Sequence, residues 1–340
     1  MINVKEITRD DSTLTRSLEI KIGTESLYTP AVASDIPSSL DSIGEIYIEV
    51  KSTHDEEDIS LTRRFLMKHS KLEKARAFIV VINFSEPVKH QTVPVTAIFD
   101  ALTEISRLAP ILICGPSMKK GKWEDFANLT SVFTSEAQSR GFKIFPMFVP
   151  RIIDPIKQLE YLYKYNKHGI NYELVCIDYS GSNPFSKNQD HLKYVAILRE
   201  LEKEYGPTVT YGVNIHPIFY ASKYPVAPAK DLASFYAHID IIGARSHVKR
   251  VPPPTGYNVK ASYKYLLNVE GYIYERSEVV SDVEIHNISK KIEESHKLFD
   301  LIKRGETLLD YLKKKEISRV DEKILKLIRR FASTYKASIL

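Results

Sequence analysis

Eight short apolar segments recur along this chain, and most are separated from the next by one amphipathic segment. Each apolar segment is bounded by turn-forming residues and is short enough to be a buried strand. The segments between them place apolar residues at helical spacing. Helices are the usual crossovers between parallel strands, so this alternation predicts a parallel sheet. The predicted strands are Leu27–Val32, Glu45–Val50, Ala77–Ile82, Pro110–Cys114, Phe142–Val149, Glu173–Ile177, Thr208–Val213 and Ile239–Gly243.

Eight strands are the number in a (β/α)8 or TIM barrel, which usually takes about 250 residues. We therefore predict an α/β fold with a barrel core at residues 27–250. An N-terminal hairpin at 1–26 leads into it, and residues 251–340 add a barrel-closing helix and a basic helical tail. An open doubly wound sheet is the alternative, since Ala33–Gly44 is too short for a full crossover helix. The predicted helices are Asp58–Lys74, Val95–Leu108, Trp123–Arg140, Asp154–His168, Asn188–Tyr205, Val283–Gly305, Leu308–Lys315 and Val320–Tyr335.

The composition narrows the class of protein. No apolar run approaches the roughly 20 residues that cross a bilayer, and the first residues lack the apolar core of a secretion signal. Cys114 and Cys176 lie in strand-like segments, so we expect buried thiols and a reducing, cytoplasmic compartment. Two distant cysteines do not make a cysteine-rich zinc site. We expect no membrane, no metal and no cofactor.

The positive charge is concentrated at the C-terminal end. From residue 284 onward there are 14 Lys or Arg and 9 Asp or Glu, whereas the first 283 residues sum to zero. A basic helical tail suits electrostatic contact with phosphates. A solvated helix face is the competing interpretation.

Polar residues follow several predicted strands, and barrels of this class place function at the carboxyl ends of their strands. A carboxylate there can act as nucleophile or base, and a histidine can titrate near neutral pH. The predicted catalytic residues are Asp178, His216 and Asp240. The predicted substrate-binding residues are Asn83, Tyr179, Ser180 and Asn214. The predicted nucleic-acid-binding residues are Arg245, His247, Lys249 and Arg250.

Each of these predictions has a structural alternative. Asp178 can instead accept from the amide of Ser180 or Gly181 as an Asx turn. The histidines can serve packing alone, and the charges of Arg245 and Lys249 can be solvated loop charges.

Three patches resemble the tRNA-guanine transglycosylase family, in order along the chain. Leu18–Pro30 (LEIKIGTESLYTP) is similar to the hairpin ending in Thr-Pro that enters the family's barrel. Pro228–Arg250 (PAKDLASFYAHIDIIGARSHVKR) resembles its last strand with the basic loop beyond. Ile285–Leu312 (IHNISKKIEESHKLFDLIKRGETLLDYL) resembles its barrel-closing helix. The resemblance spans residues 14–312 and implies exchange of guanine in tRNA or DNA for a 7-deazaguanine.

The chain departs from the family at its functional positions. The family's nucleophile and base are aspartates after the last and third strands, and the matching positions here are Gly243 and Asn83. The family's zinc cysteines are missing, although His286 keeps the place of the fourth ligand.

Three functions remain open. The first is a divergent enzyme of the pentosyltransferase type, acting on tRNA or DNA through Asp178 with His216 or Asp240 nearby. The second is a non-catalytic protein that binds nucleic acid, as a homodimer or with a catalytic partner subunit. The third is a barrel lyase or isomerase on a phosphorylated metabolite.

Overall fold

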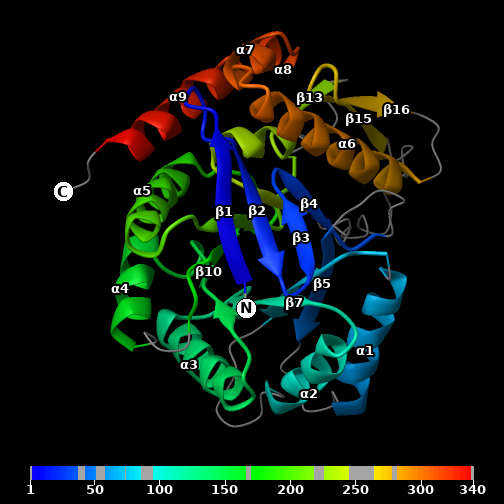
Figure 1. Ribbon diagram of the computed structural model, residues 1–340, viewed down its shortest axis with the longest axis vertical. Coiled ribbons are helices and arrows are strands. Elements are labelled where there is room, and N and C mark those ends of the chain that lie inside the picture. The colour runs from blue at the N-terminus through cyan, green and yellow to red at the C-terminus, as the bar shows by residue number, and fades with distance from the viewer. Residues whose placement is uncertain are drawn as a thin grey trace, which may run out of the picture.

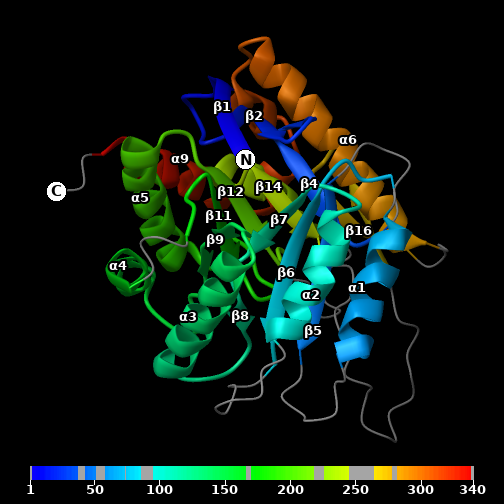
Figure 2. The same ribbon diagram turned by 60° about the horizontal axis from the view of Figure 1, so that its bottom comes forward.

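A closed parallel barrel lies at the centre of the molecule (Figures 1 and 2). The structure is a computed structural model that describes residues 2–36, 43–50, 58–72, 74–85, 95–165, 170–217, 226–244, 264–277 and 282–337. The barrel strands are β4 (Ala31–Ser34), β5 (Ile43–Val50), β6 (Phe78–Phe84), β7 (Ile111–Cys114), β9 (Ile144–Phe145), β10 (Met147–Phe148), β11 (Leu174–Asp178), β12 (Val209–Val213) and β14 (Ile241–Ala244). A two-residue strand, β8 (Ser117–Met118), pairs with the end of β6.

The barrel closes through a strand that is split in two. β9 pairs with β7 and β10 pairs with β11, and the two pieces flank Pro146, which has no N–H to give to a ladder. The carbonyl of Pro146 still accepts from the Cys176 amide at 2.8 Å. On the other side β14 pairs with β4, so the described strands run once around a ring of eight positions. The predicted TIM barrel is confirmed, and the open-sheet alternative is wrong.

The first barrel strand begins later than predicted. The expected strand Leu27–Val32 is divided at Pro30: its first part belongs to β3 (Glu25–Tyr28), and its second part starts β4. β3 joins β2 (Arg16–Ile22) and β1 (Ile2–Arg9) in an antiparallel sheet. Contacts from Arg16 place this sheet at the amino ends of the barrel strands. Strands β2 and β3 form a hairpin ahead of the barrel, and β1 adds a third strand that the sequence did not predict.

Helices surround the barrel, as the periodicity predicts (Figure 2). They are α1 (Asp58–Lys71), α2 (Val95–Ser106), α3 (Trp123–Ser139), α4 (Pro155–Tyr165), α5 (Asn188–Tyr205) and the 3-10 helix η1 (Leu232–Ala237). Their apolar faces pack on the outward side of the strands, as Phe148 and Tyr194 do with ring centroids 5.5 Å apart.

The C-terminal part combines a small sheet with helices. Strands β13 (Val226–Pro228), β16 (Ile273–Ser277) and β15 (Lys264–Asn268) form an antiparallel sheet that the sequence did not predict. The helices are α6 (Val283–Lys303), α7 (Leu308–Lys313), α8 (Ile317–Val320) and α9 (Lys323–Lys336). Three of them, α6, α7 and α9, lie close to the predicted ranges, and the short α8 was not predicted. In Figure 1 these helices lie along the rim of the molecule, with α9 next to α5.

Alternation along the strands decides which residues enter the barrel. In β11 the side chains of Leu174, Cys176 and Asp178 point one way, and those of Val175 and Ile177 point to the helices. The Sγ atoms of Cys176 and Cys114 lie 2.8 Å apart and fully buried. Both thiols are free and buried, as predicted. The same alternation brings Asp178 to the inner rim of the barrel at the carboxyl end of β11.

Candidate functional site

Asp178 is the centre of a polar cluster at the carboxyl end of the barrel, which we call the mouth cluster. Its carboxylate is fully buried. One oxygen accepts from the Ser117 hydroxyl at 2.6 Å, and the other accepts from the Asn214 amide nitrogen at 3.1 Å. The Ser180 backbone N–H also donates to it at 2.8 Å, which is the Asx turn foreseen as the alternative. Asp178 therefore caps its own loop and also faces the mouth.

Arg151 joins the mouth cluster from the neighbouring strand, because β10 pairs with β11. It follows β10, and its guanidinium lies 3.0 Å from the Asp178 carboxylate. It also donates to the Ser117 hydroxyl at 3.0 Å, to the Met118 carbonyl at 2.7 Å and to the Ser180 hydroxyl. The predictions had not singled out Arg151 or Ser117, because a loop arginine and a lone serine are unremarkable in sequence. The arginine thus holds three loops together around Asp178.

Two buried amide oxygens near the mouth cluster have no hydrogen-bond donor among the described residues. Asn214 ends β12 in a left-handed conformation, with φ 53°. Because a carboxylate only accepts hydrogen bonds, Asn214 must turn its nitrogen to Asp178, and its Oδ1 finds no donor among the described residues. Asn83, which pairs with Ser117 between β6 and β8, also has an Oδ1 with no donor in the described part of the chain. Both side chains are buried, with 7% and 1% of their surface exposed.

Below the mouth cluster a second polar pair fills the barrel interior. The Tyr211 hydroxyl donates to the buried carboxylate of Glu45. Gly243 makes room for this pair, since a Cβ at that position would lie 2.6 Å from the Tyr211 hydroxyl and 2.9 Å from a Glu45 oxygen. Burial raises the pKa of Tyr211 well above its ordinary value, so this phenol stays a donor. Gly243 is thus required by packing, and a carboxylate from another strand lies beside it.

Tyr179 does not belong to the mouth cluster. It follows Asp178, so it points outward, where its hydroxyl meets His191 Nδ1 at 2.6 Å. His191 Nε2 lies 2.7 Å from the Ala237 carbonyl, which fixes the N–H on Nε2 and leaves Nδ1 to accept. Burial lowers the pKa of His191 to about 4. The prediction that Tyr179 binds substrate is corrected: it joins the barrel to its helical layer.

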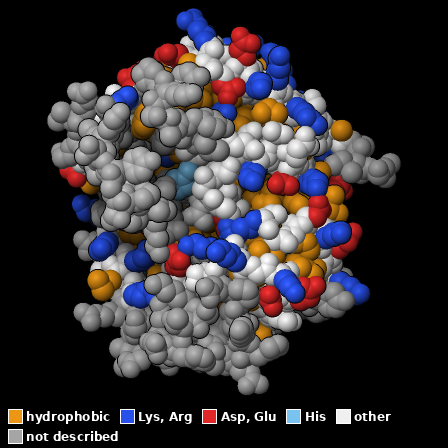
Figure 3. All heavy atoms as spheres, turned by 180° about the vertical axis from the view of Figure 1, so that it is seen from behind, with side chains coloured by type: hydrophobic (Ala, Val, Ile, Leu, Met, Phe, Trp, Pro, Cys, Tyr) orange, Lys and Arg blue, Asp and Glu red, His pale blue; other side chains and the backbone are white. Residues whose placement is uncertain are grey.

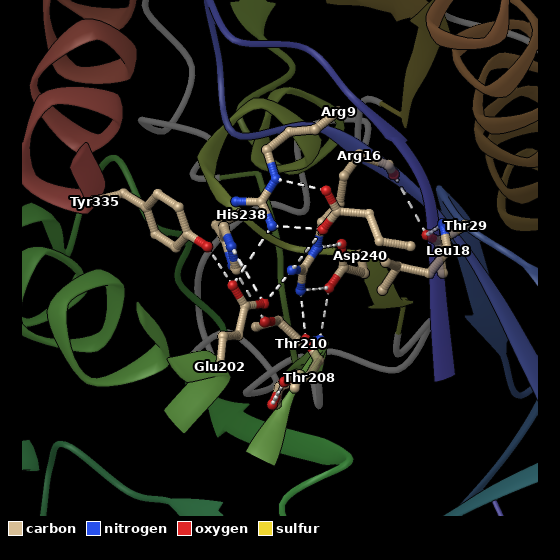
Figure 4. Close-up of polar contacts among 12 residues, drawn as sticks. Arg9, Arg16, Leu18, Thr29, Glu202, Thr208, Thr210, His238, Asp240 and Tyr335 are labelled. Atoms are coloured by element: carbon tan, nitrogen blue, oxygen red, sulfur yellow. Dashed lines mark hydrogen bonds and ion pairs between the residues drawn. The ribbon is translucent and has the colours of Figure 1, made fainter. Parts of the chain in front are cut away.

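Asp240 lies at the opposite end of the barrel from Asp178, since it precedes β14 whereas Asp178 ends β11. Figure 4 shows Asp240 with Arg16 and Thr210. Asp240 sits at the amino end, where it accepts from Arg16 Nε at 2.9 Å, from Arg16 Nη2 at 2.7 Å and from the Thr210 amide at 2.7 Å. Arg16 is fully buried and also bonds to Glu202 and to the Thr208 carbonyl. The expectation that Asp240 acts beside Asp178 is therefore corrected.

Arg16 and its partners form what we call the basal charge cluster. Glu202 accepts from Tyr335 of α9 and lies 3.5 Å from Arg9 of β1. Burial alone would raise the pKa of Glu202, but the charges of Arg16, His238 and Arg9 lower it to about 2. The cluster ties the N-terminal sheet and the C-terminal helix to the barrel, and its role is structural.

The other predicted residues are placed as follows. Ser180 is exposed at the rim and belongs to the mouth cluster through Asp178 and Arg151. The His216 backbone is held at the rim by Ser182 and Asn183, with its amide donating to the Ser182 carbonyl at 2.9 Å. The predicted phosphate contacts Arg245, His247, Lys249 and Arg250 lie outside the described residues.

Metal ligands do not gather in the described part of the chain, where no group of three His, Cys, Asp or Glu side chains has the arrangement to hold an ion. His286 is exposed on α6, and its neighbour Asn287 instead binds the backbone of β15, accepting from Leu267 at 2.8 Å. None of the described helices is long and apolar enough to cross a membrane. On the face shown in Figure 3, Lys and Arg side chains are interspersed with Asp and Glu among the described residues.

Comparison with known proteins leaves the family open. No protein-family model matches the chain. No curated protein matches it either. Among solved structures it is similar to a type I 3-dehydroquinate dehydratase from Clostridium difficile with covalently modified comenic acid, at 10% identity and a TM-score of 0.35, over 69% of this chain and 90% of that chain. This likeness is too distant to bear on function, and the resemblance to transglycosylases stays a prediction from the sequence.

Proposed function

We propose that the mouth cluster binds a guanine-type base, as the base-recognition site of a divergent tRNA-guanine transglycosylase-like protein that binds nucleic acid. The observation that carries this proposal is the pair of buried amide oxygens, Asn83 Oδ1 and Asn214 Oδ1, that no described donor meets. A buried acceptor without a donor costs about 1–3 kcal/mol. A ligand that supplies two N–H donors recovers that cost for both oxygens.

The chemistry of the ligand follows from the two hydrogen-bond donors that the amide oxygens of Asn83 and Asn214 require. Guanine presents the ring N1–H and the 2-amino group side by side, and a 7-deazaguanine keeps that edge. Hypoxanthine lacks the 2-amino group, and adenine lacks a proton on N1. The two unmet acceptors therefore favour guanine over both. Buried polar groups discriminate strongly against an analogue that leaves one of them unpaired.

The state of Asp178 supports recognition rather than nucleophilic attack. Its two oxygens already accept from Ser117, Ser180 and Asn214, and the Arg151 guanidinium lies against it. A carboxylate whose two oxygens are both held by donors from the protein is poorly placed to attack a substrate or to accept its proton. We therefore assign Asp178 the role of orienting Asn214, and we place a non-catalytic binding protein ahead of base exchange.

A phosphorylated metabolite fits the described cations less well. Arg151 is engaged with Asp178, and Lys119, another described cation near the mouth, is paired with Glu49 at 2.7 Å. A phosphate would have to compete with a carboxylate for either of them.

Calorimetric titration of the protein with guanine, hypoxanthine and adenine tests the proposal. We expect guanine to bind about 5- to 150-fold more tightly than hypoxanthine, the range that corresponds to one unmet buried acceptor. The variant Asn83→Leu should lose guanine binding, whereas Asn188→Ala, which changes a partly exposed amide at the start of α5, should keep it. Equal affinity for the three bases would refute the proposal.

Exchange of labelled guanine into tRNA and DNA separates binding from catalysis. No exchange by a wild-type protein that binds guanine supports the non-catalytic assignment. Exchange that disappears in Asp178→Asn would overturn it in favour of an enzyme.

A further inference from the structure

Helix α9 presents an exposed face made of cations. Lys323, Lys326, Arg329 and Arg330 are all exposed. Residues 323–336 contain no Asp or Glu. None of the four side chains has an ion pair or hydrogen bond among the described residues, unlike Lys313 on α7, which pairs with Asp310 at 2.6 Å.

The four cations lie on one side of the helix. At about 100° per residue they fall within an arc of roughly 120°. The buried residues Ile324, Ile328, Phe331 and Ala332 lie on the opposite side. The sequence therefore builds a helix with one apolar and one cationic face.

The apolar face is already used within the molecule. The Phe331 ring lies 4.6 Å from the His191 ring and 6.0 Å from the Phe185 ring, so α9 is docked on α5 and on the loop after β11. Tyr335 adds a hydrogen bond to Glu202 in the basal charge cluster. This docking leaves only the cationic face for a partner. A lipid surface is disfavoured, because membrane-surface helices bind through an apolar face that α9 has already buried.

We infer that the exposed face of α9 binds the phosphate backbone of a nucleic acid, at a site separate from the mouth cluster. From Lys323 to Arg330 the helix rises about 10 Å, which spans two or three successive phosphates of one strand. Backbone contacts of this kind fix position without reading sequence. The inference rests on the proposed function for its choice of polyanion, and it adds the surface that holds the polymer.

A variant with Lys323, Lys326, Arg329 and Arg330 all changed to Gln tests the inference. The matched control removes the same charge from exposed lysines scattered over the molecule: Lys5, Lys71, Lys74 and Lys157. The probes are a fluorescently labelled tRNA transcript and a mixed-sequence DNA duplex, titrated between 50 and 200 mM salt. Guanine binding is measured on the same samples, together with sedimentation on phosphatidylserine vesicles.

If the α9 face makes three backbone contacts, these contacts alone make the affinity for the polymer fall about 40-fold between 50 and 200 mM salt. We expect the α9 variant to lose this part of the salt dependence and the control variant to keep it. Both variants should bind guanine equally well. Equal polymer affinity in the two variants would overturn the inference. Wild-type protein that sediments with the vesicles but binds neither tRNA nor DNA would also overturn it. If guanine fails to bind but the α9 variant still loses the polymer, the base-binding proposal falls and this inference stands.

Discussion

The basal charge cluster gives a prediction that separates structural from catalytic aspartates. In the variant Asp240→Asn the amide oxygen can keep the bonds from the Thr210 amide and from Arg16 Nη2. The amide nitrogen then faces Arg16 Nε, which is also a donor, so the bond of 2.9 Å is lost. Hydrogen bonds to charged groups contribute about 1.5–3 kcal/mol.

The loss of charge adds to the loss of that bond. Arg16 is fully buried and keeps Glu202 and, at 3.7 Å, Glu6 as anionic partners. Removing one partner of a buried ion pair costs about 3–5 kcal/mol. Because Glu202 and two hydrogen bonds remain, we expect the lower end, about 3 kcal/mol, in the free energy of unfolding.

Urea unfolding followed by the fluorescence of Trp123, the single tryptophan, measures this change. The matched control is Glu200→Ala, which breaks an exposed pair with Lys203 on the same helix as Glu202. An exposed pair contributes roughly 0–1 kcal/mol, so this control should unfold almost as the wild type does. Asp240→Asn should retain guanine binding wherever it remains folded. Unchanged stability combined with lost guanine binding would refute the structural assignment of Asp240.

Three further predictions concern the interior. Asn83→Leu should leave the free energy of unfolding unchanged or raise it by about 1 kcal/mol, because it removes an unmet buried acceptor; marked destabilisation in thermal unfolding would argue against this. Gly243→Ala should destabilise by about 1–3 kcal/mol, since its Cβ would meet Tyr211 and Glu45, and wild-type stability in urea would show that the interior has spare room. The pKa of His191 is about 4 in the folded protein, below its ordinary 6.5. As the pH falls, this histidine is therefore protonated in the unfolded chain before it is protonated in the folded one. Stability should therefore fall by about 3 kcal/mol as the pH drops from 6.5 to 4, and His191→Gln should flatten that part of the pH profile.

The barrel was predictable because it depends on short-range patterns. Each strand is a short apolar run, and each helix carries its own periodicity, so both can be found without knowing their partners. Asp178 was found for the same reason, since it ends the apolar run of β11. The signal that should have excluded Tyr179 was also present: strict alternation sends its side chain outward when Asp178 points inward.

The parts that could not be predicted depend on distant residues. Asp240 meets Arg16, which is 224 residues away in the chain, so this contact has no local signal. The predicted strand Ile239–Gly243 did place Asp240 at the start of a strand, which is the end of the barrel away from Asp178. Arg151 looks like any loop arginine until the pairing of β10 with β11 brings it to Asp178. The unmet oxygens of Asn83 and Asn214 appear only when the donors of the described residues are placed.

A crystal structure of the protein with guanine tests the proposed site most directly. It should show the ring N1–H and the 2-amino nitrogen about 2.7–3.2 Å from the amide oxygens of Asn83 and Asn214, with Asp178 still bound to Arg151. Guanine bound elsewhere, or seated in the barrel mouth with both amide oxygens still unmet, would contradict the proposed function.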